Sequence, residues 1–364
     1  MIILAAAIIG TIIGAAALAV FLLFFITRPV SDSDKRAVPV GGMLKSDTLS
    51  YKSKASRGIE KRLTVKFMQL MWKFISKSDN AKHAKQTPPD VDEIKNIPYT
   101  DDGNRYHTFD VYYPKKTLKK LPVIIDIHGG GWMYAEKSLN EYYCKSLADR
   151  GFCVFNLSYR LAPDVTVNEQ LQDIAAALKH INENSSHFPC DMNSVMLTGD
   201  SAGGQLSAYS AVLLQSEELR RIFDVEDANI KLTALLLTSP AAFMKKGATS
   251  IYTKILWGTD YKKKETYKYM NLDEIIGFAQ LPPTYLITSS GDSVARSQTL
   301  EAARVIEKSG VKCVLRDYEK YNGKHLPHVF SVLEPFDEIG KQTIDDAVSF
   351  YKEQLNKAPA SNTD

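Results

Sequence analysis

Residues 195–214, VMLTGDSAGGQLSAYSAVLL, change character near their centre. The apolar run 195–198 is typical of a short buried strand, and the small residues at 203–214 suit a helix that packs closely. A G-x-S-x-G sequence centred on Ser201 joins the two. Its small residues allow a sharp strand-to-helix turn, which would project the serine hydroxyl beside the free amides of a helix N-terminus. The stretch therefore predicts a strand, an exposed serine and a helix in direct succession.

The alternation of strands and helices continues on both sides of this stretch. Further strands are expected at 105–113, 123–127, 152–157, 232–237, 284–288 and 311–315, and further helices at 167–181, 296–308 and 337–355. Residues 246–280 are aromatic and lysine-rich and interrupt the pattern, so we expect them to form cap or pocket wall. Strands that alternate with helices predict an α/β fold with a mostly parallel central sheet and helices on both faces.

Composition excludes several classes of protein. The chain has 364 residues, of which 45% are hydrophobic, with 45 basic and 42 acidic side chains. This is too apolar for a disordered chain, and a net charge of +3 gives no reason to expect a nucleic-acid partner. The four cysteines show neither a pairing pattern nor metal-ligand spacing, so the sequence predicts no disulfide framework. No phosphate-binding loop and no set of metal ligands is recognisable in the sequence, which therefore predicts no metal and no cofactor.

The first 26 residues, MIILAAAIIGTIIGAAALAVFLLFFI, carry no charged side chain. About 20 apolar residues span a bilayer as a helix, so the sequence favours an uncleaved membrane anchor over a signal peptide or a buried helix. Residues 27–90 carry a net charge of +8, and positive flanks stay inside. We therefore expect a single-pass membrane protein with a cytoplasmic body. A G-x-x-x-G step at 10–14 can let two membrane helices pack closely, so a second copy of the chain is a further candidate partner, as a homodimer.

The chain divides into five expected segments. They are a transmembrane anchor at 1–27, a basic linker at 28–57, an amphipathic cap or lid at 58–97, a catalytic domain at 98–357 and a tail at 358–364. The cap is inferred from apolar residues that recur with a helical period between 59 and 75, opposite a basic face. Such a helix could also lie on a membrane surface.

A second motif, His128-Gly129-Gly130-Gly131-Trp132, follows directly on the expected strand at 123–127. Three successive glycines are poor strand and helix formers, so this segment is expected to be a loop. Free amides close to the serine turn can donate hydrogen bonds to a developing oxyanion. The order of the two motifs, each after a strand, favours nucleophilic catalysis over a plain flexible turn.

The two motifs, with Ser158-Tyr159-Arg160-Leu161-Ala162-Pro163-Asp164 between them, resemble the hormone-sensitive-lipase-type esterases of the α/β-hydrolase superfamily. The resemblance covers about residues 105–355. It implies an α/β-hydrolase fold with an N-terminal helical cap over an acyl pocket, a Ser-His-Asp triad and an oxyanion hole. The expected oxyanion donors are Gly130, Gly131 and Ala202, and the motif residues that support them are His128, Gly129, Trp132 and Asp200.

The acid and the histidine should follow Ser201 in the chain, in that order. Asp292 comes after the expected strand 284–288, and Asp317 after the next strand is the alternative. The family usually has Pro-Leu after its aspartate, whereas this chain has Ser293-Val294. Two histidines remain: His328, which precedes Val-Phe in the manner of the family, is favoured over His325.

These residues predict a membrane-anchored serine carboxylesterase or lipase that cleaves short- to medium-chain acyl esters through an acyl-enzyme. Ser201 would attack the ester, His328 would move the proton and Asp292 would orient the histidine. The expected partners are a small acyl-ester or lipid-like substrate and the membrane. An amidase or deacetylase would use the same triad, and a non-catalytic ligand-binding protein on the same scaffold is a third reading.

Overall fold

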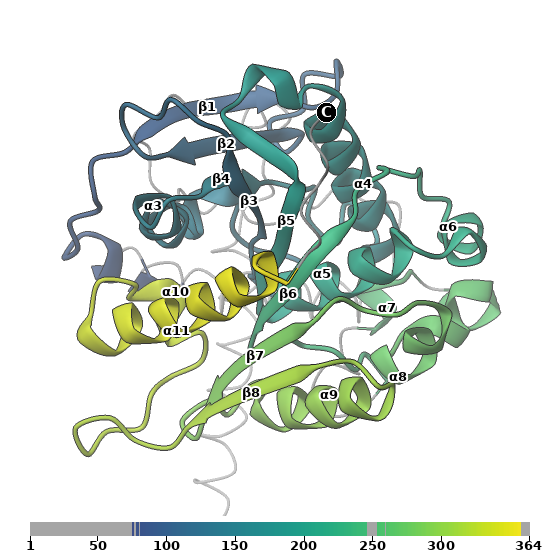
Figure 1. Ribbon diagram of the computed structural model, residues 1–364. Helices are drawn as coiled ribbons and strands as arrows, with labels where there is room; N and C mark the ends of the chain where they lie inside the picture. Colours follow the sequence, from purple (N-terminus) through teal and green to yellow (C-terminus); the bar gives the residue numbers. More distant parts are fainter. Residues whose placement is uncertain (1–74, 76–77, 80, 246–252, 259, 358–364) are drawn as a thin grey trace, which may run out of the picture.

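The computed structural model describes residues 75, 78–79, 81–245, 253–258 and 260–357. An eight-stranded sheet runs through this part of the chain (Figure 1). Its strands are β1 (Asp92–Pro98), β2 (Thr108–Tyr113), β3 (Leu121–Ile127), β4 (Cys153–Leu157), β5 (Cys190–Asp200), β6 (Leu232–Thr238), β7 (Thr284–Ser289) and β8 (Cys313–Tyr318). The helices are α3 (Glu141–Asp149), α4 (Val167–Glu183), α5 (Ser201–Leu213), α6 (Glu217–Phe223), α7 (Thr253–Leu256), α8 (Leu272–Ile275), α9 (Arg296–Lys308), α10 (Phe330–Leu333) and α11 (Glu338–Leu355).

The strand order β1-β2-β4-β3-β5-β6-β7-β8 brings the two sequence motifs together. β1 and β2 pair antiparallel at one edge, and β4 to β8 run parallel to β3. Ile127 at the end of β3 pairs with Gly199 of β5, and Asp200 pairs with Thr238 of β6. The carboxyl ends of these parallel strands therefore meet at one edge of the sheet, where ligand sites of α/β proteins form.

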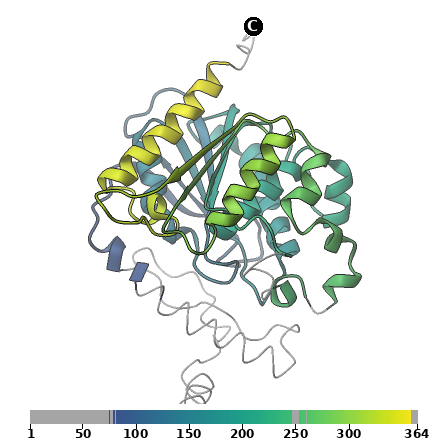
Figure 2. The same cartoon turned by 90° about the horizontal axis from the view of Figure 1, so that it is seen from below.

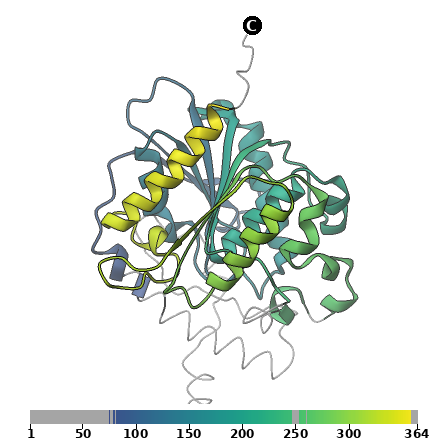
Figure 3. The ribbon, with the colours of Figure 1, turned by 60° about the horizontal axis from the view of Figure 1, so that its bottom comes forward.

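Both faces of the sheet are covered by helices. Successive side chains of the central strands point to opposite faces and are buried against different helices. Ile124 and Met196 pack with residues of α3 and α11, whereas Ile125 and Leu197 pack with residues of α4, α5 and α9. Figures 2 and 3 view the sheet nearly edge-on, with α11 on one side of it and α9 on the other. Such two-sided burial explains why the central strands read as continuous apolar runs.

The sheet begins earlier than the sequence predicted. Residues 92–97, assigned to the cap segment 58–97, belong to β1, which pairs with β2 through Asp92↔Tyr113 and Pro98↔Thr108. Most side chains of β1 are exposed or half-buried, since the strand lies at the edge of the sheet and one side faces solvent. A mostly polar edge strand carries no apolar run to reveal it.

The expected fold class needs a correction at the N-terminus. Over the ranges that the structure describes, no helix is both long enough and apolar enough to cross a membrane. The predicted transmembrane helix at 1–27 lies outside those ranges, as do the linker 28–57 and the tail 358–364. The fold class that the described residues support is an α/β fold with a mostly parallel sheet, without the transmembrane helix that the sequence predicted.

The described end of the predicted cap segment packs against the segments that follow β3 and α10. The Asp79 carboxylate lies 3.4 Å from the hydroxyl of Tyr134, a residue of the loop that follows β3. The Lys82 ammonium donates to Glu334 at 2.9 Å, and His83 stacks on Tyr142 of α3 with ring centroids 4.8 Å apart. These contacts join Asp79, Lys82 and His83 to three separate parts of the body.

The substitution Asp79→Asn should stabilise the protein at neutral pH. Burial raises the pKa of Asp79 to about 6, against the attraction of Lys82. Because the folded state holds the Asp79 proton more tightly than the unfolded state does, the contribution of Asp79 to the free energy of unfolding is fully present below the unfolded pKa near 4. This contribution is lost as the pH rises through 6. Asn removes the buried charge, so we expect the free energy of unfolding to rise by about 1–2 kcal/mol at pH 8 and little at pH 4. Urea unfolding at both pH values measures this.

The exposed Asp101 supplies the matched control. Asp101→Asn should change the free energy of unfolding equally at both pH values. An Asp79→Asn variant that is destabilised at pH 8 would contradict this account of the Asp79 contact.

Candidate active site

Ser201 lies where β5 ends and α5 begins. Its φ angle is +52°, in the left-handed region that residues other than glycine rarely adopt. Two glycines make this turn possible, because a Cβ atom at Gly199 would overlap the Gly203 carbonyl across the turn, and one at Gly203 would overlap the backbone at the end of β3. The turn predicted from the sequence is therefore present, and it presents a half-buried serine at the first position of a helix.

Gly203→Ala should unfold or strongly destabilise the protein. A Cβ atom at position 203 would overlap the carbonyl oxygens of Ile127 and His128, both of which are fixed in backbone. We expect the free energy of unfolding to fall by about 3 kcal/mol or more. Gly277→Ala is the control, since a Cβ atom there meets nothing within 4 Å. Thermal unfolding of the two variants tests the prediction, and equal melting temperatures would contradict it.

Asp292 follows β7 and is held by several donors. The N–H groups of Val294 and Ala295 each donate to its Oδ1 at 2.9 Å. Its side chain is buried, and burial alone would raise its pKa. The contact with His328 and the Ala295 N–H outweigh burial and lower the pKa of Asp292 to about 2. The carboxylate is therefore ionised throughout the neutral range.

His328 is brought to this carboxylate. Its Nδ1 lies 2.9 Å from Oδ1 of Asp292, and its side chain is 23% exposed. The Ser239 side chain hydrogen-bonds to Asp292, and the N–H of Ala241, two residues further on, donates to the Ser201 carbonyl at 3.0 Å. The structure thus gathers Asp292, His328 and the Ser201 turn at one edge of the sheet.

The alternative residues lie in other contacts. Asp317 forms an ion pair with Arg296 at 2.8 Å. His325 is exposed, and its Nδ1 lies 2.6 Å from the hydroxyl of Ser290. Neither residue takes part in the contact between Asp292 and His328.

The loop that carries His328 is tied to the turn that carries Asp292. The buried hydroxyl of Ser289 donates to the carbonyl of Leu326 at 2.7 Å. The same carbonyl approaches Gly291 so closely that a Cβ atom there would overlap it. Val329, next to the histidine, has a φ of +48°, an outlier for a β-branched residue. These constraints fix the backbone on both sides of the histidine contact.

The glycine loop after β3 presents free amides. Gly130 and Gly131 have φ angles of +107° and +58°, and among the described residues nothing accepts a hydrogen bond from either N–H group. Ala202 is the second residue of α5, where a helix leaves its N–H groups without partners inside the helix. These three N–H groups are the ones expected to serve as oxyanion donors.

Gly129 has a different role from its two neighbours. Its N–H donates to Oδ1 of Asp200 at 2.9 Å, so this group is already engaged. Asn140 donates to the same oxygen at 2.8 Å and to Asp126 at 2.9 Å. Asp200 therefore ties the glycine loop to the serine turn. Burial raises the pKa of Asp200 and, together with the Asp200 charge, raises that of Asp126 well above its usual range.

His128 holds the first residue of the glycine loop in place. It is fully buried and stacks on Tyr159 with ring centroids 4.4 Å apart. Its Nδ1 lies 2.7 Å from the carbonyl of Gly129, and burial lowers its pKa to about 4. A neutral, buried and stacked imidazole holds the loop through these contacts and cannot reach bulk solvent.

Several residues of the site had no signal in the sequence. Ser239, with a φ of +48°, hydrogen-bonds to Asp292, and Asn140 bridges the two buried acids. Both are distant in sequence from the residues that they contact, and neither belongs to a recognisable motif. In the described part of the chain, no group of three histidine, cysteine or acidic side chains lies close enough together to hold a metal ion.

Comparisons with known proteins identify relatives of this chain. The BD-FAE family model matches residues 109–301. The chain is similar to a crystal structure of esterase B from Lactobacillus rhamnosis inhibited by a tributyrin phosphonate, with a TM-score of 0.77 and 30% identity over 80% of this chain and 96% of that one. It is 34% identical over 104 residues to Carboxylesterase NlhH of Mycobacterium tuberculosis, which is 28% of this chain and 33% of that protein.

A plant relative matches over a longer stretch. Isoprenylcysteine alpha-carbonyl methylesterase ICME of Arabidopsis thaliana is 25% identical over 255 residues, 66% of this chain and 58% of that protein. The match thus spans less than two thirds of the length of either curated relative.

Proposed function

We propose that this chain, which belongs to the BD-FAE family, cleaves short- to medium-chain acyl esters. It is a carboxylesterase-type serine hydrolase of the α/β-hydrolase superfamily, which is the enzyme class that the sequence predicted. Ser201 is the proposed nucleophile, His328 the general base and Asp292 the residue that orients the histidine. The proposed oxyanion donors are the N–H groups of Gly130, Gly131 and Ala202.

One observation carries this proposal. The ionised carboxylate of Asp292 lies 2.9 Å from Nδ1 of His328, and Ser201 lies in a strained turn at the carboxyl end of a neighbouring part of the same sheet. A carboxylate at Nδ1 fixes the tautomer that leaves Nε2 free to take a proton.

The reaction would proceed in two acyl transfers. Nε2 of His328 takes the proton of the Ser201 hydroxyl as Oγ attacks the ester carbonyl, and the N–H groups receive the oxyanion. The C–O bond to the alcohol breaks, and His328 gives the proton to the leaving oxygen. Water then attacks the acyl-serine in the same manner and releases the acid. Asp292 stays ionised throughout, as its pKa of about 2 requires.

The proposed acyl length draws on the similar esterase structure. That esterase B was inhibited by a C4-C4 tributyrin phosphonate, an analogue of a short-chain glyceride. Butyrate esters are therefore the first substrates to try, with longer chains as the comparison.

The experiment is a series of p-nitrophenyl esters from acetate to palmitate, with p-nitroacetanilide as the amide. We expect the highest kcat/KM at four to eight carbons and cleavage of the amide at least 100-fold slower. Preferential cleavage of the amide would replace the proposal with an amidase or deacetylase. A folded protein that binds the esters and cleaves none would replace it with a binding protein.

A further inference from the structure

Trp132 ends the glycine loop in a conformation that needs support. Its φ is +62°, so three successive residues, Gly130 to Trp132, have positive φ angles. Such a conformation costs a residue other than glycine of the order of 1 kcal/mol or more and persists only where its surroundings impose it. The orientation of the Gly130 and Gly131 N–H groups depends on this turn.

Three hydrogen bonds impose the turn on Trp132. Its indole N–H donates to Oε1 of Gln205 at 2.9 Å. Its carbonyl accepts from the N–H of Ala162 at 2.9 Å and from Nε2 of Gln170 at 2.8 Å. Two of these three partners belong to helices, because Gln205 lies in α5 and Gln170 in the first turn of α4.

Gln170 joins two separate segments of the chain. Its Nε2 also donates to the carbonyl of Arg160 at 2.8 Å, so a single amide binds both that segment and the glycine loop. The side chain is fully buried. α4 itself begins with a capping box between Thr166 and Glu169, which fixes the turn that carries Gln170.

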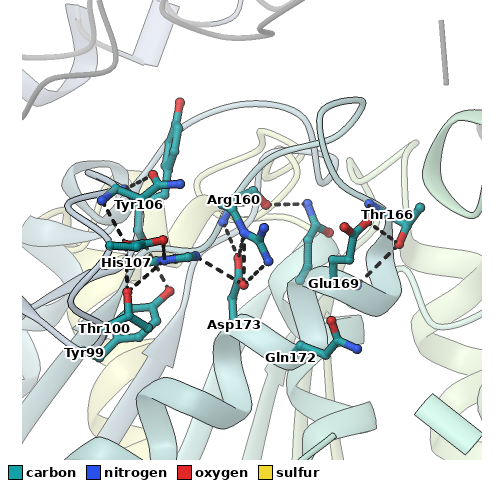
Figure 4. A network of polar contacts seen from close by, with 12 residues as sticks. Tyr99, Thr100, Tyr106, His107, Arg160, Thr166, Glu169, Gln172 and Asp173 are labelled. Atoms are coloured by element: carbon teal, nitrogen blue, oxygen red, sulfur yellow. Dashed lines mark hydrogen bonds and ion pairs between the residues drawn. The ribbon is translucent and has the colours of Figure 1, made fainter. Parts of the chain in front are cut away.

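The Arg160 side of this connection is held firmly. Asp173, one turn further along α4, accepts hydrogen bonds from the Arg160 backbone N–H at 3.0 Å and from its guanidinium at 2.6 Å (Figure 4). His107 approaches the same carboxylate at 3.3 Å from the opposite side. Gln170 thus connects the glycine loop to a rigid network of charged and polar groups.

We propose that Gln170 is a positioning residue for the oxyanion hole: its amide holds the carbonyl of Trp132, and thereby keeps the Gly130 and Gly131 N–H groups aimed at the reacting carbonyl of the substrate. The inference rests on the proposed function of the site. Oxyanion donors act through alignment, and a misplacement of about 1 Å can cost about 100-fold in rate. The effect of losing Gln170 therefore falls on the transition state rather than on substrate binding.

The test compares Gln170→Met with Gln172→Met. Methionine keeps about the same volume as glutamine and removes the donor. Gln172 lies on the same helix, but its amide points away and donates to the carbonyl of Asp224 at 3.0 Å. For p-nitrophenyl butyrate we expect Gln170→Met to lower kcat about 10- to 100-fold with KM changed less than threefold, and Gln172→Met to change kcat less than twofold.

A trifluoromethyl ketone separates positioning from general damage. Ser201 Oγ would add to the ketone carbon, the serine proton would pass to His328, and the resulting oxyanion would occupy the hole. Its inhibition constant should rise in Gln170→Met by the same factor as kcat falls. An unchanged inhibition constant, or a loss of kcat equal to that of Gln172→Met, would overturn the inference.

Amide hydrogen exchange gives a readout that does not need activity. The N–H groups of Met133 and Tyr134 donate to the carbonyl of Gly130, so their protection reports on the turn. In Gln170→Met their exchange should speed up at least tenfold, while that of the central strands stays unchanged. Unchanged exchange would overturn the inference. If the wild-type chain cleaves no ester, the proposed function is refuted. Faster exchange in Gln170→Met would then still support the role of Gln170 in holding the turn.

Discussion

Ser201→Ala should lower kcat for p-nitrophenyl butyrate by about 10⁴- to 10⁶-fold, the largest effect of any single substitution proposed for this chain. The expected loss is this large because alanine offers no oxygen for the acyl group, and the two-step route through an acyl-enzyme disappears. The remaining rate would come from the oxyanion donors and from substrate binding. KM should change little, since the methyl group of alanine fills most of the space of the serine side chain. Stopped-flow kinetics should also show that the initial burst of p-nitrophenolate is lost.

Ser297→Ala is the matched control for this variant. It makes the same change at an exposed position of α9, away from the turn, and should leave kcat within twofold of wild type. A Ser201→Ala variant that keeps more than about a tenth of the wild-type kcat would place the nucleophile elsewhere in the chain.

His328→Gln should lower kcat by about 10⁴-fold or more, whereas His325→Gln should lower it no more than about fivefold. His328 lies 2.9 Å from the ionised Asp292, and its loss leaves the serine without a base. His325 is exposed and contacts Ser290, so its substitution affects only the outer part of the loop. The pair decides between the two histidines that the sequence left open.

A double variant tests whether His328 acts together with Asp292. If His328→Gln and Asp292→Asn act in one unit, the double variant should be scarcely slower than His328→Gln alone. Larger losses in His325→Gln than in His328→Gln would contradict the arrangement, and so would additive effects of His328→Gln and Asp292→Asn.

The sequence predicted the central strands well because of how they are buried. β3, β4 and β5 have helices on both sides, so their apolar runs are continuous and bounded by turn residues. β1 was missed because an edge strand with the sequence DEIKNIP carries no such run. α3 was also missed, and its buried residues include Cys144 and Ser146, which weaken the apolar period that would reveal it.

In the site, too, features set by neighbouring residues could be predicted from the sequence, whereas long-range contacts could not. The Ser201 turn and the glycine loop were predictable, since each depends on glycines that lie within a few residues of one another in the chain. The sequence could not show that Asp200 engages the Gly129 N–H, or that Gln170 and Ser239 support the site, because these contacts join residues at least 38 positions apart. Local sequence carries no record of such pairs.

One labelling experiment tests the central claim most directly. The full chain is treated with a p-nitrophenyl butylphosphonate ester, which transfers its phosphonyl group to an activated serine and releases p-nitrophenolate. The account predicts one p-nitrophenolate released per chain, an adduct that peptide mass spectrometry places on Ser201, and no adduct in Ser201→Ala or His328→Gln. An adduct on another residue, or a folded chain that releases no p-nitrophenolate, would contradict it.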